Sequence, residues 1–128
     1  MNTKPDSTFF CSSRFCGTLL GLVVFFLYWP ATRCEFTHYD DLTYYVDNAH
    51  VQDGLTVHSV FWAFTTGTAS NWHPLTWLSH MLDVELTGKP DPFVPHLTNI
   101  IFHAVNSVLL FFLLQKITGA HWRSLFVA

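Results

Sequence analysis

The stretch HLTNIIFHAVNSVLLFFLLQK, residues 96–116, decides the fold of this chain. Its 18 residues from Leu97 to Leu114 carry no charge and are mostly apolar. A helix of about 17–25 predominantly apolar residues is long enough to cross the hydrocarbon core of a bilayer. The stretch therefore predicts a transmembrane helix over residues 97–114.

A second apolar run lies near the N-terminus. The 18 residues Phe15–Thr32 lie between Arg14 and Arg33 with no charge between them. A cleavable signal peptide is the alternative to a span, because Lys4 and Arg14 precede the run. The sequence Pro30-Ala31-Thr32-Arg33 at the end of this run is a poor signal-peptide cleavage site, because such sites have small residues at alternate positions. We therefore interpret residues 15–32 as an uncleaved first span.

The composition agrees with a membrane protein of one domain at most. Charged residues make up 12% of the chain, hydrophobic residues 50% and aromatic residues 17%, and the mean hydropathy is +0.28. An average soluble domain carries about 25% charged residues. A net charge of −3 offers no basic surface for nucleic acid. The three cysteines, Cys11, Cys16 and Cys34, do not suggest a disulfide framework.

The positive residues predict how the chain is oriented. Lysine and arginine collect on the cytoplasmic side of membrane proteins. Two of them precede the first span, two follow the second, and the 64 residues between hold only Arg33 and Lys89. The loop between the spans is therefore expected outside the cytoplasm. The predicted parts are a cytoplasmic N-terminus (1–14), a first span (15–32), an extracytoplasmic loop (33–96), a second span (97–114), a cytoplasmic turn (115–123) and the start of a third span (124–128).

The loop is predicted to contain two short amphipathic helices. Thr56 is a candidate N-cap, and Pro74 occupies a typical first helical position. Gly88 ends the second helix. Such helices lie in the membrane interface or pack onto other helices of a larger bundle, and the sequence leaves both open. The apolar stripes comprise Val57, Val60, Phe61 and Phe64 in the first helix and Leu75, Leu78, Leu82 and Leu86 in the second.

Two groups of polar residues are candidates for chemistry. Asp40 and Asp41 lie shortly after the first span, where a carboxylate can act as a base or bind a cation. A solvated turn is the alternative. His96, Asn99, His103 and Asn106 share one helical face, which indicates either hydrogen bonds to partner helices or a direct substrate role. The eight histidines lack zinc-site spacings, so no histidine-based metal site is predicted.

Five segments resemble one group of membrane enzymes. They are FTHYDD, NAHVQDGLT, FWAFTT, NWHPLTWLSHMLD and HLTNIIFHAVNSVLLFFLL, within residues 36–128. The resemblance is to the bacterial tetratricopeptide-repeat membrane glycosyltransferases of the GT-C fold. Their eukaryotic relatives are the transmembrane and tetratricopeptide-repeat O-mannosyltransferases. The segment NAH departs from the Asn-Pro-His that relatives often have.

The resemblance implies an all-α GT-C-like N-terminal part in a bacterial inner (plasma) membrane. It implies a hexosyltransferase, mannosyltransferase-like, that transfers sugar from a polyprenyl-phosphate-linked donor to a protein or glycan acceptor. Asp40 and Asp41 would be the catalytic pair, one of them the general base. His73 and His96 would lie near the reaction centre, with Asn99 and His103 as further substrate-binding candidates. No resident metal is implied, although a divalent ion at the acidic pair stays open.

The same resemblance implies that further transmembrane helices follow this fragment, and that the fragment alone is inactive. One competing hypothesis is a small bitopic membrane protein that binds partner helices without catalysis. Another is a secreted soluble domain released by signal cleavage, which leaves the apolar stretch Leu97–Leu114 unexplained.

Overall fold

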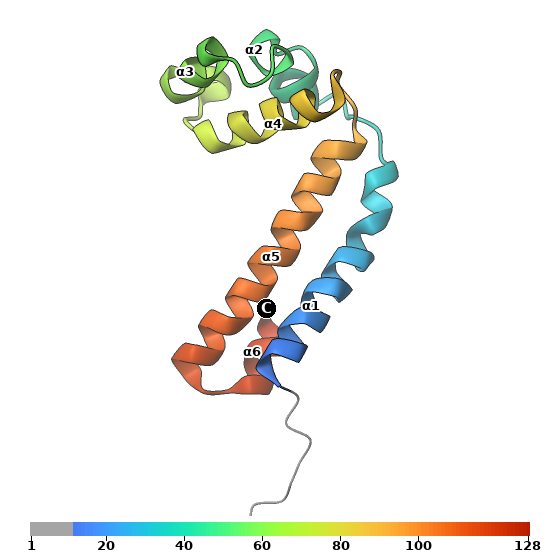
Figure 1. Cartoon of the computed structure of the whole chain (residues 1–128), viewed down its shortest axis with the longest axis vertical. Helices are drawn as coiled ribbons and strands as arrows, with labels where there is room; N and C mark the ends of the chain where they lie inside the picture. The colour runs from blue at the N-terminus through green and yellow to red at the C-terminus, as the bar shows by residue number, and fades with distance from the viewer. Residues whose placement is uncertain (1–11) are drawn as a thin grey trace, which may run out of the picture. The chain divides into compact units, whose positions relative to one another are not determined.

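The computed structural model describes residues 12–128 (Figure 1). The first eleven residues, with Lys4, Cys11 and most of the predicted cytoplasmic N-terminus, lie outside the described part. Of the described residues, 78% are helical and none lies in a strand. It forms two compact units. The first combines the described residues up to Tyr28 with Ile100–Ala128, and the second is Trp29–Asn99.

The first unit holds the two apolar helices. Helix α1 (Ser13–Tyr28) continues through the 3-10 turn η1 (Trp29–Arg33) to give 21 helical residues, and α5 (Phe93–Thr118) has 26. Both are long and apolar enough to cross a membrane. Only 17% of the most apolar window of each helix is buried, so neither is a covered core helix within this chain. The predicted spans, 15–32 and 97–114, lie inside these two helical segments.

The ends of the helices differ from the sequence boundaries. Helix α5 begins at Phe93, before the predicted Leu97, because Pro95 falls in its first turn, where proline removes no helical hydrogen bond. Its end at Thr118 shortens the predicted turn 115–123 to Gly119 and Ala120, with Gly119 at φ +66°. Helix α6 (His121–Val127) then begins ahead of the predicted third-span start at residue 124.

Helices α1 and α5 run antiparallel, as Figure 1 shows for the blue and orange helices, and side chains of α5 lie over two glycines of α1. A Cβ on Gly17 would lie 2.8 Å from Cζ of Phe112, and one on Gly21 would lie 3.1 Å from Cγ2 of Val108. The two glycines are four residues apart and so lie on one face of α1. This small-xxx-small spacing permits close helix approach in membranes, and the sequence analysis did not single it out.

A polar contact joins the three helices of the first unit. The side-chain nitrogen Nε2 of Gln115 donates to Oγ of Ser13 at 2.7 Å and lies 2.6 Å from Nδ1 of His121. Gln115 thereby links the start of α1, the end of α5 and the start of α6. Cys34, in the second unit, is free and exposed.

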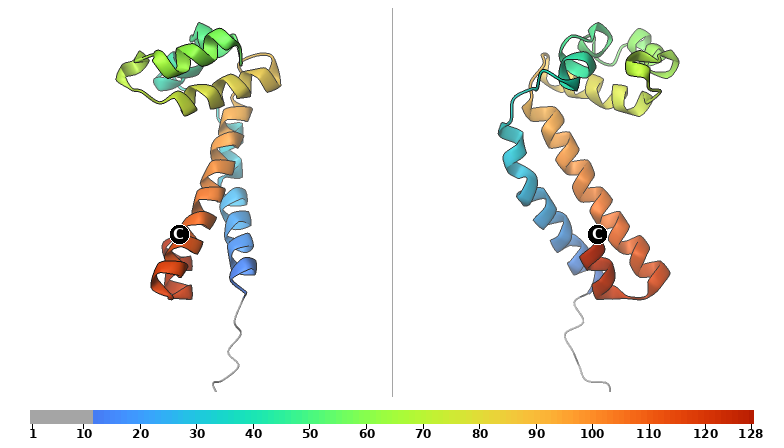
Figure 2. Two further views of the ribbon diagram at one scale, coloured as in Figure 1. Left: turned by 60° about the vertical axis from the view of Figure 1, so that its left-hand side comes forward. Right: turned by 180° about the vertical axis from the view of Figure 1, so that it is seen from behind.

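The second unit consists of short helical elements around α4 (Pro74–Thr87). Figure 2 shows α2 and α3 packed against α4. Its other elements are η1, the π-helix η2 (Leu42–Val46), α2 (Ala49–Gln52), α3 (Val57–Thr65), the 3-10 turn η3 (Thr68–Ser70) and the first residues of α5.

The predicted helix signals in this unit are confirmed. The side chain of Thr56 accepts a hydrogen bond from the Ser59 backbone N–H, which caps α3. Pro74 is the first residue of α4. Gly88 ends α4 in the left-handed conformation, with φ +68°, and its N–H donates to the Val84 carbonyl.

The core of the second unit combines aromatic and aliphatic side chains. Helix α4 buries Trp77, Met81 and Val84, which lie on one helical face, and α3 buries Ser59 and Ala63. Most residues of the predicted stripes lie outside this core: Val57 is 91% exposed and Leu75 is 75% exposed, whereas Leu78 packs against the core. The buried hydrophobic cluster comprises Tyr45, Val51, Ala63, Trp77, Met81 and Val84.

The contact between Gly17 and Phe112 predicts that a larger side chain at Gly17 destabilises the first unit. Gly17→Leu inserts a branched side chain against Phe112 and must displace that ring or the helix that carries it. We expect a loss of about 1–3 kcal/mol in the free energy of unfolding in detergent micelles, as for other overpacked sites. Val23→Leu, at an exposed position of α1, is the matched control and should change nothing. Equal stability of both variants would contradict the close contact.

Candidate functional site

The two adjacent carboxylates have different surroundings. Asp41 is half-buried, and its Oδ2 accepts hydrogen bonds from the backbone N–H of Thr37 at 2.8 Å and from the Thr37 hydroxyl at 3.1 Å. Asp40 is exposed, and no residue of the described chain forms a hydrogen bond or ion pair with its carboxylate. The carboxylate of Asp41 therefore accepts hydrogen bonds that hold the segment from Thr37 to Asp41 together. Both carboxylate oxygens of Asp40 remain available to a ligand.

An aromatic stack joins the segment after the acidic pair to His73. The ring of Tyr44, in η2, stacks on His73 with centroids 5.4 Å apart and on Trp77 at 5.1 Å. Asn71 also donates to the Tyr44 hydroxyl at 3.4 Å. The buried Nε2 of His73 has no hydrogen-bond partner among the described residues. The ring of His73 thus contacts η2 through Tyr44. Element η2 directly follows Asp40 and Asp41 in the chain.

The other predicted site residues do not join this group. His96 is half-buried with an unpartnered Nε2, and Asn99 is exposed. Within the described chain, neither makes a hydrogen bond or ion pair with the acidic pair. His103 belongs to the first unit, where its ring meets that of Tyr28 edge to face at 4.9 Å. Asn106 is exposed in the same unit.

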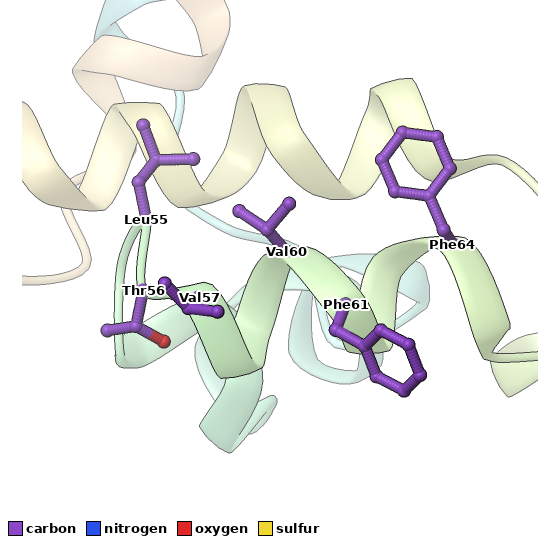
Figure 3. A pocket seen from close by; sticks show the side chains of 6 residues that line it. All are labelled: Leu55, Thr56, Val57, Val60, Phe61 and Phe64. Carbon is purple, nitrogen blue, oxygen red and sulfur yellow. The ribbon is translucent and has the colours of Figure 1, made fainter.

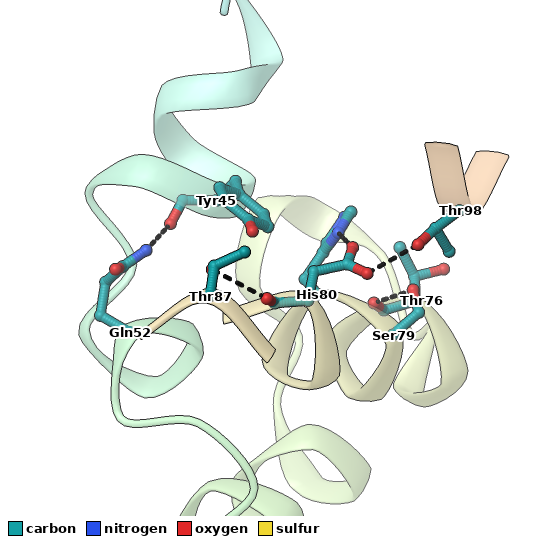
Figure 4. A network of polar contacts seen from close by, with 8 residues as sticks. Tyr45, Gln52, Thr76, Ser79, His80, Thr87 and Thr98 are labelled. Carbon is teal, nitrogen blue, oxygen red and sulfur yellow. Dashed lines mark hydrogen bonds and ion pairs between the residues drawn. The ribbon is translucent and has the colours of Figure 1, made fainter. Parts of the chain in front are cut away.

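The sequence analysis missed a buried polar group around Asp83, which is drawn in Figure 4. Asp83 on α4 is 2% exposed, and its Oδ1 accepts a 2.7 Å hydrogen bond from the Thr98 hydroxyl. Its Oδ2 lies 3.9 Å from Nδ1 of His80, too far for a hydrogen bond. The ring of His80 meets that of Tyr45 edge to face at 5.3 Å.

Three buried polar atoms in this group lack hydrogen-bond partners in the described chain: the Tyr45 hydroxyl, Nδ1 of His80 and Oδ2 of Asp83. An unpaired buried polar atom costs stability, so such groups persist where packing or function holds them. Burial, followed by the negative charges of Asp83 and Asp91, raises the pKa of Tyr45 well above its ordinary value of 10.0. Tyr45 is thus held as a neutral phenol that fixes η2 against α4.

A signal for this group was present in the sequence. His80 and Asp83 are three residues apart within NWHPLTWLSHMLD and so share a face of the predicted helix. The burial of Asp83 depends on Thr98, 15 residues away, which no local pattern reveals.

Within residues 12–128, no group of three or more histidine, cysteine, aspartate or glutamate side chains is arranged to hold a metal ion. Comparison of the chain with protein-family models, with curated proteins and with solved structures finds no match.

The buried phenol predicts a dependence of stability on alkaline pH. Because the pKa of Tyr45 is raised on folding, the unfolded chain releases this proton first as the pH rises above 10.0. The free energy of unfolding should be constant below that pH and fall above it, by at most about 1.4 kcal/mol per pH unit.

The matched variant is Tyr45→Phe, which removes the ionisable hydroxyl and its unpaired buried oxygen. Its stability at neutral pH should equal or exceed that of the unchanged chain, and the alkaline fall should shrink. Unfolding in micelles, followed by circular dichroism from pH 7 to pH 12, measures both effects. The same alkaline slope in both proteins would show that Tyr45 is not the group responsible.

Proposed function

We propose that this chain is the N-terminal, membrane-anchored part of a GT-C-type glycosyltransferase, with Asp40 as its catalytic base. The enzyme would transfer a hexose from a polyprenyl-phosphate-linked donor to an acceptor hydroxyl outside the cytoplasm. The observation that carries the proposal is the difference between the two carboxylates. Asp41 is occupied by Thr37, and Asp40 is exposed and unpaired within the described residues.

The chemistry asked of Asp40 is a single proton transfer. As the acceptor oxygen attacks the anomeric carbon, its proton passes to the Asp40 carboxylate, and the polyprenyl phosphate leaves with the electron pair of the broken bond. Attack opposite the leaving group inverts the anomeric configuration through an oxocarbenium-like transition state. A positioned base contributes typically about 10²–10⁴ to the rate of such a step.

Three features support this assignment of roles. The resemblance of FTHYDD and NWHPLTWLSHMLD to the glycosyltransferase family gives the reaction class. The stack of Tyr44 on His73 joins η2, the segment that follows FTHYDD, to NWHPLTWLSHMLD in one unit. Two helices apolar enough to span the membrane adjoin that unit in sequence, which supports access to a membrane-bound donor. The extracytoplasmic side and a third span from α6 onward belong to the same proposal.

The test compares single substitutions at the native gene locus. Asp40→Asn removes the base and should lower the transfer of radiolabelled hexose from its polyprenyl phosphate in isolated membranes by about 10²-fold or more. Asp41→Asn should have a smaller effect, because an amide oxygen still accepts from Thr37.

Asp47→Asn is the matched control, since it makes the same charge change at another exposed carboxylate close by. It should leave transfer unchanged. Full transfer by the Asp40→Asn enzyme, with its amount in the membrane verified, would exclude Asp40 as the base. An equal loss in Asp47→Asn would mean that loop charge, rather than a base, is responsible.

A second candidate function, a bitopic protein that binds partner helices, is favoured by one observation. Asn99, His103 and Asn106 are exposed on α5, where polar side chains of a span normally meet another helix or a water-filled cavity. In that case Asn99→Leu and Asn106→Leu abolish co-purification of the partner, and Asp40→Asn has no consequence. The glycosyltransferase proposal predicts the opposite: Asp40→Asn has the large effect, and Asn99→Leu and Asn106→Leu have the smaller one.

A further inference from the structure

The two apolar helices of the first unit carry a groove with an arginine at one end. The groove has a volume of about 380 Å³ and is lined by residues of α1 and α5. Gly17 and Gly21 line it on α1, and Val108 and Phe112 line it on α5. Arg14, at the start of α1, is the only charged residue among the described residues that line the groove. The groove thus has an apolar length and one positive end.

The first unit has positive side chains and no negative ones in its described part. Residues 12–28 and 100–128 contain Arg14, Lys116 and Arg123 but no aspartate or glutamate. Every acidic residue within residues 12–128 belongs to the second unit. Arg14 is exposed and forms no ion pair with any residue of this described chain. A negative partner for its guanidinium group is therefore to be sought outside the described chain.

The three basic residues gather at the same end of the unit. The side chains of Ser13 and Gln115 are hydrogen-bonded at 2.7 Å, so the start of α1 adjoins the end of α5. Arg14 follows Ser13 in the chain, and Lys116 follows Gln115. A second hollow, of about 250 Å³, has Arg123 of α6 among its lining residues. Positive charges that gather in this way attract anions to one end of the unit.

The position of Arg14 along α1 corresponds to the level of lipid phosphate groups. Residues 15–28 are α-helical and residues 29–32 belong to the 3-10 turn. The uncharged stretch between Arg14 and Arg33 is therefore about 29 Å long. The hydrocarbon core of a bilayer is about 30 Å thick, so a spanning α1 places Arg14 at its boundary with the headgroups. A guanidinium group binds a phosphate there through two parallel hydrogen bonds.

The charge distinguishes this groove from the hollows of the second unit. The hollow drawn in Figure 3, of about 540 Å³, has no charged residue among its described lining residues. A hollow of that kind selects no ligand by charge, whereas Arg14 favours an anion. Helix α6 is a poor occupant of the groove, because it carries Arg123 and no carboxylate and would bring a second positive charge toward Arg14.

We propose that the groove along α1 and α5 binds an anionic phospholipid. The phosphate group lies on Arg14, and one acyl chain runs past Gly17 and Gly21, where the missing side chains leave room. Basic pockets between transmembrane helices bind anionic headgroups in this way, because phosphate supplies the missing negative charge while the tail stays in hydrocarbon.

Native mass spectrometry of the full chain in a neutral detergent tests this proposal. The protein is mixed with equal amounts of phosphatidylglycerol and phosphatidylcholine, which carry the same acyl chains and differ in net charge. Arg14→Gln removes the positive end, and Arg33→Gln is its matched control at an exposed arginine outside the groove. Thr18→Phe fills the groove from an exposed position that lines it, and Val23→Phe is its control on α1 outside the groove. Unchanged helical content verifies the fold of each variant.

The unchanged chain should retain phosphatidylglycerol about fivefold more than phosphatidylcholine, the effect of one basic residue near an anionic lipid surface. Arg14→Gln should remove this preference, and Thr18→Phe should lower the retention of both lipids. Both control variants should behave like the unchanged chain.

Three results would overturn the proposal. Equal retention of the two lipids by the unchanged chain would show that the groove does not select an anion. An equal loss of preference in Arg33→Gln would assign the attraction to net charge rather than to the groove. A mass of two chains without lipid would assign the groove to a second copy. Sugar transfer is not measured, so the outcome is separate from that of the glycosyltransferase proposal.

Discussion

The organisation of this chain depends on one property of a bilayer: its hydrocarbon core offers no hydrogen-bond partner to backbone N–H and C=O groups. A segment inside hydrocarbon must therefore form all its backbone bonds internally, and a helix does so within one stretch of chain. The two long apolar segments accordingly form α1 and α5, and Gly17 and Gly21 leave room on α1 for the Phe112 and Val108 side chains of α5. Everything between them is a separate unit with its own core.

The second unit has a mixed core and leaves other apolar side chains exposed. Its buried cluster combines two aromatic residues with aliphatic and sulfur-containing ones, namely Tyr45, Val51, Ala63, Trp77, Met81 and Val84, and Leu78 packs against it. Val57, Phe61, Leu75 and Leu86 lie outside this core. Burial of these exposed side chains against an apolar neighbour would be favourable, because it would remove apolar surface from water.

Local features of the fold were predictable, and distant contacts were not. Thr56, Pro74 and Gly88 act through their own backbone neighbours, so the helix ends of α3 and α4 could be predicted from sequence. The periodicity identified the residues of the two apolar stripes. It did not indicate whether the stripes face the core or the outside, because an apolar stripe suits a core and a membrane equally.

The candidate site shows the same limit. The sequence pointed to Asp40 and Asp41 together, but only the contact with Thr37 separates the occupied carboxylate from the available one. The buried Asp83 escaped notice because its burial depends on Thr98 and on the packing of Tyr45. The resemblance implied a place for His73 near the reaction centre, and in the structure its ring stacks on Tyr44, three residues after Asp41.

The measurement that tests the account most directly is the accessibility of Cys34, a free and exposed thiol in the second unit just beyond the first span. Intact cells are treated with a membrane-impermeant maleimide, and the Cys34→Ser chain gives the background. The account predicts that Cys34 is labelled in intact cells as fully as in lysed ones, which places the loop outside the cytoplasm. Labelling only after lysis would reverse the topology and remove Asp40 from the side on which sugar transfer is proposed.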